Sequence, residues 1–119
     1  KAAKSYIHAR DLGRAIYLVS EKAPLGKIYN AGPKDPTSIK DVVSMCADAL
    51  GKNFDDICDM APDRLGQDSM YWLDSNSIFQ DTGWKQEILW EEGLSEMVEW
   101  GKKYINTLKD HPMDYTLRA

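Results

Sequence analysis

The residues that could do chemistry are concentrated in one short stretch of the chain. A guanidinium, three carboxylates, an amide and a phenol lie within twelve positions, on Asp63, Arg64, Gln67, Asp68, Tyr71 and Asp74. Gly66 lets the backbone turn sharply among them. Because an arginine donates two parallel charged hydrogen bonds to a phosphate, the stretch is typical of an anion-binding loop. A polar surface loop with an incidental ion pair is the alternative reading of the same residues.

Further candidate ligand contacts lie at the ends of predicted elements, where binding sites are usually built. Lys4 precedes the first predicted strand and Asn30 ends the second. Thr37 and Ser38 open a predicted helix, whose free N–H groups favour anions. These positions join the charged stretch in one predicted set of anion and sugar contacts. The predicted binding residues are Lys4, Asn30, Ser38, Arg64 and Gln67.

The sequence offers little for catalysis or for a bound metal. It contains neither a glycine-rich phosphate loop nor a serine in a nucleophile elbow. His8 and His111 lack metal-ligand spacing, and His8 is expected to be a packed or hydrogen-bonded histidine. Cys46 and Cys58 are expected to be buried free thiols of a reducing cytosol. We therefore expect no catalytic residue, cofactor-binding residue or metal site in this chain.

Composition describes one ordinary globular domain. The chain has 119 residues, of which 43% are hydrophobic and 29% are charged. Its net charge of −4 argues against nucleic acid as a partner. There is neither a signal peptide nor an apolar run of about eighteen residues, so we expect no membrane span and a cytoplasmic location. The start at Lys1, without an initiator methionine, suggests a piece of a longer polypeptide.

Hydrophobic periodicity predicts a helix-rich mixed α/β domain with short strands. Strands are expected at 5–9, 27–31 and 54–60, and helices at 12–22, 39–50, 75–82 and 91–109. Asp11, Ser38 and Asp74 are the expected N-terminal caps, with Asp41 at the capping-box position after Ser38. Residues 110–119 are expected to be a flexible tail. The short strands would leave exposed edges if nothing paired with them.

Taken in order, several segments resemble the extended short-chain dehydrogenase/reductases of the NAD-dependent epimerase/dehydratase family, which act on nucleotide sugars. The matching segments are SYIHARD at 5–11, IYNAG at 28–32, SIKDVV at 38–43, PDRLGQD at 62–68 with Tyr71 and Asp74, and TGWK, EGL and Trp100 between 82 and 100. The resemblance covers about residues 4–105. The arginine block is most similar to that of dTDP-glucose 4,6-dehydratases.

The resemblance implies a C-terminal substrate-binding lobe whose Rossmann core is absent, so that 1–119 is a single partial domain. It implies that Arg64 holds a nucleotide diphosphate and that Gln67 faces the nucleotide. Lys4 stands where the family usually has arginine, and it keeps the charge without the bidentate fork. In the family the N-terminal domain carries NAD and a Tyr-x-x-x-Lys pair. No tyrosine of this chain is followed four residues later by lysine.

The resemblance also implies what the parent enzyme does. The parent would oxidise a sugar at C4 by hydride transfer to NAD and then dehydrate or epimerise it, while this fragment alone would be inactive. The implied partners are a dTDP- or UDP-sugar, the chain's own N-terminal Rossmann domain and the second subunit of a homodimer. Neither nucleic acid nor a membrane is implied. A stand-alone binding or protein-interaction module that reuses the scaffold is the alternative.

Overall fold

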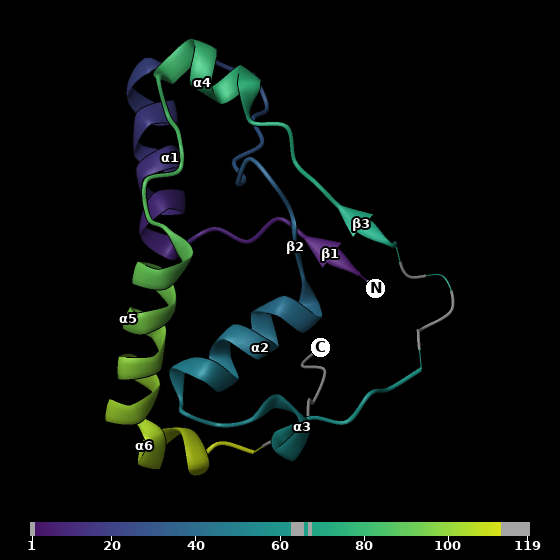
Figure 1. The fold of residues 1–119 in the computed structure, drawn as a ribbon. Helices are drawn as coiled ribbons and strands as arrows, with labels where there is room; N and C mark the ends of the chain where they lie inside the picture. Colours follow the sequence, from purple (N-terminus) through teal and green to yellow (C-terminus); the bar gives the residue numbers. More distant parts are fainter. Residues whose placement is uncertain (1, 63–65, 67, 113–119) are drawn as a thin grey trace.

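A computed structural model describes residues 2–62, 66 and 68–112 of the chain (Figure 1). Arg64 and Gln67 lie outside the described residues, as does most of the predicted tail at 110–119. In chain order the elements are β1 (Ala3–Lys4), α1 (Ala9–Lys22), β2 (Thr37–Ser38), α2 (Ile39–Ala49), α3 (Phe54–Ile57), β3 (Met70–Tyr71), α4 (Asn76–Thr82), α5 (Trp90–Lys103) and α6 (Ile105–Lys109). The predicted helix-rich α/β class is confirmed.

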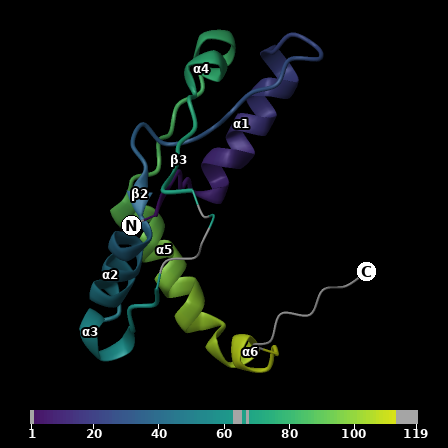
Figure 2. The ribbon, with the colours of Figure 1, turned by 90° about the vertical axis from the view of Figure 1, so that its right-hand side faces the viewer.

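The helices form a frame around a small sheet. α1 and α4 pack together at one end, and α5 with α6 runs down one side (Figures 1 and 2). α2 and α3 lie at the other end, where α2 contacts α5. The buried core lies between α1 and α4, where Ala15, Ile78 and Trp84 are each no more than 2% exposed. Apolar residues from the segments 5–8 and 27–31 pack against this core.

The sheet has the order β2-β1-β3. β1 runs antiparallel to β2 and parallel to β3. Beyond the strand ends, the Ser5 N–H donates to the Tyr71 carbonyl at 2.9 Å, and the Ile39 N–H donates to the Ala2 carbonyl at 3.0 Å. Three segments that are far apart in sequence therefore meet through main-chain hydrogen bonds.

The buried carboxylate of Asp11 ties α1 to the segment before α5. Asp11 is 1% exposed, and its oxygens accept the N–H groups of Glu87 at 3.1 Å and Ile88 at 2.9 Å. The Arg14 guanidinium donates to the same carboxylate at 3.0 Å. The Trp84 indole N–H donates to the Asp11 carbonyl at 2.9 Å. The Asp11 carboxylate thus has three donors around it, as a buried charge requires, and the Asp11 carbonyl accepts a fourth.

His8 and Gly93 form a second contact between α1 and α5. The His8 side chain is 12% exposed, and its Nδ1 accepts the Arg10 N–H at 3.2 Å, so His8 is packed and hydrogen-bonded as predicted. A Cβ on Gly93 would lie 3.1 Å from the imidazole Cδ2 and 3.4 Å from Ile88 Cγ2. The first turn of α5 therefore approaches α1 closely only because residue 93 has no side chain.

The start of the first predicted helix is wrong, and so are all three predicted strands. α1 begins at Ala9, because His8 rather than Asp11 caps it, and Asp11 is drawn into the core instead. The strand predicted at 54–60 is the short helix α3, and Asp55 and Asp56 in its first turn suit the positive end of a helix dipole.

The other boundaries change less. The helix predicted at 91–109 is divided into α5 and α6 at Tyr104, whose φ of −106° and ψ of 15° leave the helical region. The strands predicted at 5–9 and 27–31 are absent, because residues 5–8 and 27–31 pair with no strand among the described residues and residue 9 begins α1. Cys46 and Cys58 are free but half-buried rather than buried.

Asp11→Ala is expected to lower the free energy of unfolding by about 3 kcal/mol, because it removes a buried hydrogen-bonded charge and leaves two N–H groups without an acceptor. Asp35→Ala, at an exposed position, is the matched control and should change stability by less than about 0.5 kcal/mol. Urea unfolding monitored by tryptophan fluorescence measures both variants. Equal stability of the two would show that the Asp11 contacts contribute little.

The same carboxylate should make stability depend on pH. Burial raises the pKa of Asp11, but the hydrogen bonds from Ile88, Arg14 and Glu87 outweigh it, so the pKa lies below its ordinary value of 3.8. The contribution is complete above the unfolded-state pKa and is lost as the pH falls through the lowered folded value. Urea unfolding between about pH 6 and pH 3 should therefore show a decline that Asp11→Asn reduces. An unchanged decline in that variant would contradict the assignment.

Candidate functional site

The central strand carries the first of the predicted binding residues. Lys4 is exposed, and its Cα partners are Thr37 on β2 and Tyr71 on β3. Residues paired in this way project their side chains from the same face of a sheet. Lys4, Thr37 and Tyr71 therefore form a row of one ammonium, one hydroxyl and one phenol, and the phenol-bearing residue is 56% exposed. These are donors that suit an anionic ligand.

Ser38 lies beside Lys4 in the sheet but belongs to the opposite face. Its Cα partner is Ala3, one residue away from the row that contains Lys4. Its hydroxyl accepts the Asp41 N–H at 3.0 Å and donates to the Asp41 carboxylate at 2.6 Å. The predicted cap of α2 is confirmed, and the Ser38 hydroxyl is occupied by it. On β2, Thr37 is the residue whose side chain shares the face of Lys4.

Asn30 is not brought into the sheet. It is exposed, on the segment that leads from α1 to β2. Two residues later this segment passes close to the chain that follows β3, because a Cβ on Gly32 would lie 3.1 Å from the Leu73 Cβ. The Ser75 hydroxyl accepts the Gly32 N–H at 2.8 Å and donates to the Gly32 carbonyl at 3.1 Å. Asn30 therefore belongs to a segment that is fixed near β3 without pairing with it.

The charged stretch around Arg64 leads directly into the sheet. Arg64 and Gln67 lie outside the described residues, so their side chains are not placed. Between them Gly66 has a φ of 77°, the left-handed conformation that favours glycine. From Ser69 onward the chain is bonded to β1, because the Ala3 N–H donates to the Ser69 carbonyl at 3.1 Å. The stretch therefore ends against the strand that carries Lys4.

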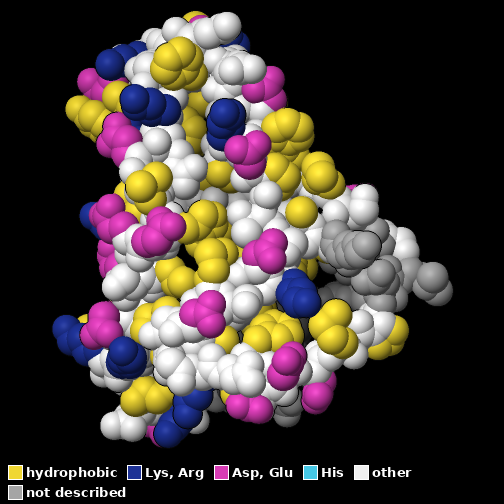
Figure 3. Space-filling view, viewed as in Figure 1, with side chains coloured by type: hydrophobic (Ala, Val, Ile, Leu, Met, Phe, Trp, Pro, Cys, Tyr) yellow, Lys and Arg dark blue, Asp and Glu magenta, His cyan; other side chains and the backbone are white. Residues whose placement is uncertain are grey.

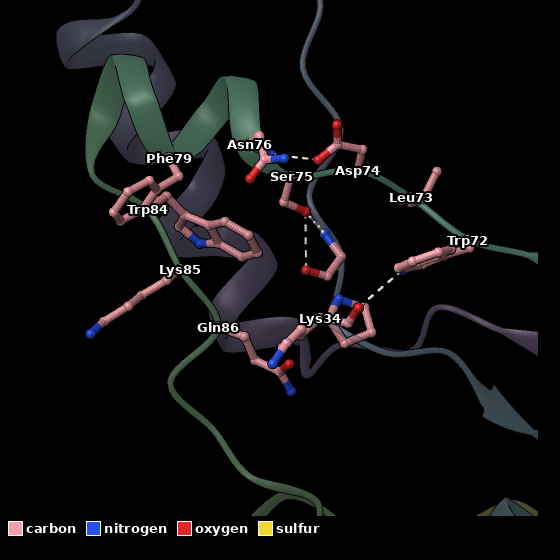
Figure 4. A pocket seen from close by; sticks show the side chains of 12 residues that line it. Lys34, Trp72, Leu73, Asp74, Ser75, Asn76, Phe79, Trp84, Lys85 and Gln86 are labelled. Atoms are coloured by element: carbon pink, nitrogen blue, oxygen red, sulfur yellow. Dashed lines mark hydrogen bonds between the residues drawn. The ribbon is translucent and has the colours of Figure 1, made fainter.

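A cavity of about 730 Å³ lies beside the sheet, and its lining was not anticipated from the sequence. Its wall includes Gly32, Lys34, Trp72, Phe79 and Gln86 (Figure 4). The Trp72 indole N–H donates to the Lys34 carbonyl at 3.1 Å, which fixes the ring although the residue is 60% exposed. The one signal that could have indicated this wall is a tryptophan directly after Tyr71. The wall carries aromatic surface and two cations, Lys34 and Lys85.

A second cavity, of about 760 Å³, lies between the segment 6–10, α2 and α5. Hydrophobic side chains surround a hollow in this region of the surface (Figure 3). Its lining includes Cys46, Leu94 and Trp100, and the polar groups gather at His8. The His8 Nε2 lies 3.7 Å from a carboxylate oxygen of Glu96, which also pairs with Arg10. Among the described residues, none of the His, Cys, Asp and Glu side chains gather as metal ligands.

A charged cluster fastens the segment 27–31 to α4. The Asp81 carboxylate accepts the Tyr29 hydroxyl and the Lys27 ammonium, each at 2.6 Å. Burial and the adjacent Asp81 raise the pKa of Tyr29 to about 12, so the phenol remains the donor. Hydrogen bonds from Lys27 and Tyr29 lower the pKa of Asp81. The cluster is an anchor for this segment.

Comparison with known proteins confirms the resemblance seen in the sequence. No family model matches the chain. Its homologues and structural neighbours are dTDP-glucose 4,6-dehydratases and related epimerases and dehydratases of the extended short-chain dehydrogenase/reductase family, matched over their C-terminal part. In the described part of the chain, no helix combines the length and apolar character needed to cross a bilayer.

dTDP-glucose 4,6-dehydratase 1 of Escherichia coli K12 is 28% identical over 115 residues, which are 89% of this chain and 32% of that enzyme. The crystal structure of the dTDP-glucose 4,6-dehydratase of Bacillus anthracis with NAD matches 88% of this chain and 33% of its own, at 27% identity and a TM-score of 0.78. DesIV of Streptomyces venezuelae, a dTDP-glucose 4,6-dehydratase with NAD and TYD bound, matches 89% and 33% at 25% identity and a TM-score of 0.79. The chain spans between 14% and 32% of the length of the curated relatives it matches.

Ser38→Ala should cost about 1 kcal/mol of stability, because it removes the cap of α2. Ser38→Asp, which restores a capping oxygen, should recover most of the loss. Thermal unfolding measured by circular dichroism compares the two variants, with Ser95→Ala as the control at an exposed serine of α5. Full stability of Ser38→Ala would contradict the capping role.

Proposed function

We propose that this chain is the substrate-binding portion of an NAD-dependent nucleotide-sugar dehydratase or epimerase, and that it binds the diphosphate of a dTDP- or UDP-sugar. The similarity to dTDP-glucose 4,6-dehydratases supports the class of enzyme. The binding role rests on Arg64, Gln67 and Lys4; of the other two predicted residues, Asn30 lies outside the sheet and the Ser38 hydroxyl caps α2.

The pairing of β1 with β3 is the observation that carries the proposal. It joins the strand that contains Lys4 to the chain that emerges from the Arg64 stretch. Lys4 and the residues that follow the arginine stretch, from Ser69 onward, then belong to one sheet. A diphosphate carries its negative charges on neighbouring phosphoryl groups and is recognised by clusters of arginine and lysine. Thr37 and Tyr71, in the row of Lys4, would add neutral donors to the same face.

The residues of this chain indicate which role it would have in the parent enzyme and which role would belong to the rest of that enzyme. Its sequence has no glycine-rich phosphate-binding loop and does not fit NAD, so the cofactor would be held by the part of the parent outside this chain. NAD would there accept a hydride from the sugar C4, before dehydration or epimerisation. The residues of this chain would hold the nucleotide diphosphate and thereby orient the attached sugar. Such positioning lowers the entropic barrier of the reaction.

Arg64→Ala in the full-length parent is expected to weaken binding of dTDP or UDP by about 1.5–3 kcal/mol, because a charged hydrogen-bonding partner of the phosphates is lost. Isothermal titration calorimetry measures the effect. Arg10→Ala is the matched control, since Arg10 is exposed and pairs with Glu92 and Glu96 on α5 rather than with the sheet. Equal affinity of the Arg64 variant and the unmodified protein would overturn the proposal.

A further inference from the structure

The cavity of about 730 Å³ beside the sheet is large enough to hold a small molecule. Pockets that bind such ligands commonly measure about 300–1,000 Å³ and combine apolar walls with a few polar groups. Lys4, Thr37 and Tyr71 are absent from the described lining of this cavity. It is therefore separate from the row of side chains on which the proposed function depends, and that function leaves it without a role.

Trp72 gives the cavity a fixed aromatic surface. Its indole N–H donates to the Lys34 carbonyl at 3.1 Å, yet 60% of the residue is exposed. Large aromatic side chains usually contribute to stability through burial, which this ring largely forgoes. Because the hydrogen bond already restricts the ring, little conformational entropy remains to be lost when a ligand stacks on it. An exposed, oriented ring of this kind is typical of a platform for a flat aromatic ligand.

A second exposed aromatic ring lies across the cavity from Trp72. It belongs to Phe79 on α4, which is 55% exposed. In Figure 4, Trp72 lies on one side of the cavity and Phe79 on the other, with Lys34 between them. The wall between the two rings is held together, because the Ser75 hydroxyl is bonded to both main-chain groups of Gly32. The cavity is therefore preformed and has aromatic surface on two sides.

The charged groups of the lining favour an anion. Lys34 and Lys85 are both exposed, and neither forms an ion pair with a described residue. Asp74 is the acidic residue of the described lining, and one of its carboxylate oxygens accepts the Asn76 N–H at 2.9 Å. Figure 4 shows this carboxylate directed away from Lys34. An anionic group placed beside the Lys34 ammonium would therefore receive a charged hydrogen bond without facing the carboxylate.

We propose that this cavity is a second ligand site, which binds a planar aromatic molecule that carries a phosphate or a carboxylate group. The aromatic part stacks on Trp72, and the anionic group is bound by the Lys34 ammonium. The two contacts act together, because a single exposed ion pair contributes little by itself. An aromatic phosphate and an aromatic carboxylate present the same two features, so the test includes one of each. The site goes beyond the proposed function and does not depend on it.

Isothermal titration calorimetry on the full-length polypeptide tests the inference. Saturating NAD and dTDP are present, so that the cofactor and diphosphate sites of the parent are occupied. The probes are adenosine monophosphate and naphthoate, with adenosine and inorganic phosphate as the separated parts of the first probe. At least one of the two aromatic anions should bind at least roughly tenfold more tightly than adenosine or phosphate. Binding of the monophosphate alone would identify the anionic group as a phosphate, and binding of naphthoate alone would identify it as a carboxylate.

Substitutions then place the bound probe in the cavity. Trp72→Ala should weaken its binding by at least about tenfold, because the stacking surface is lost, whereas Trp72→Phe keeps a ring and should retain most of the affinity. Lys34→Gln should weaken binding of the anionic probe about fivefold or more and leave adenosine unaffected. Lys52→Gln, at an exposed lysine outside the cavity, is the matched control and should change neither.

The outcomes separate this inference from the proposed function. If neither aromatic anion binds, or if Trp72→Ala and Lys34→Gln leave their binding unchanged, the second site is overturned while binding of dTDP stands. Phosphate that binds as tightly as adenosine monophosphate would also overturn it, because the ring would then contribute nothing. Loss of dTDP affinity in Lys34→Gln would show that the cavity belongs to the diphosphate site, and would overturn the inference. Probe binding that depends on Trp72 in a protein that does not bind dTDP would support the second site and overturn the proposed function.

Discussion

The position of α1 relative to the segment that leads into α5 depends on the buried carboxylate of Asp11. A charge in this location is tolerated only because Ile88, Glu87 and Arg14 surround it with donors. Those contacts fix the first turn of α1 relative to the segment that leads into α5, and the Trp84 indole closes the arrangement from the core side. A hydrophobic residue at position 11 would leave the N–H groups without acceptors. The interaction therefore joins α1 to the segment before α5, and it contributes stability as well.

The sheet itself is very small. Its strands have two residues each, too few to be stable as an isolated sheet. They are held because side-chain hydroxyls extend the main-chain pattern. Ser5 accepts the Leu73 N–H at 3.1 Å, and Ser75 binds both main-chain groups of Gly32. The candidate site thus lies where the short strands, the start of α2 and Ser75 meet. Rigid helices on either side support it.

Local signals in the sequence were sufficient for some parts of this arrangement. α2 could be predicted from its cap at Ser38 and from Gly51, which has a φ of 64°. Asp11 was predicted as a cap because the pattern of a helix start is local, whereas its actual partners lie more than seventy residues away. The same limit applies to the site. The residue types of Lys4 and Ser38 predicted that both belong to it, but only the pairing register reveals that they occupy opposite faces. Trp72 was missed because no motif marks an exposed ring.

Gly93 fixes the direction of α5, which runs down one side of the molecule. The part of α5 that follows this glycine extends about 15 Å from its contact with the imidazole of His8. Because α5 is rigid, a small shift of its first turn produces a larger displacement at its other end. If a methyl group wedged the first turn outward by a few tenths of an ångström, Trp100 and α6 would swing by a larger amount, and the hollow between α5 and α2 would widen. The shape of that hollow, which Gly93 itself lines, therefore depends on a single missing carbon atom.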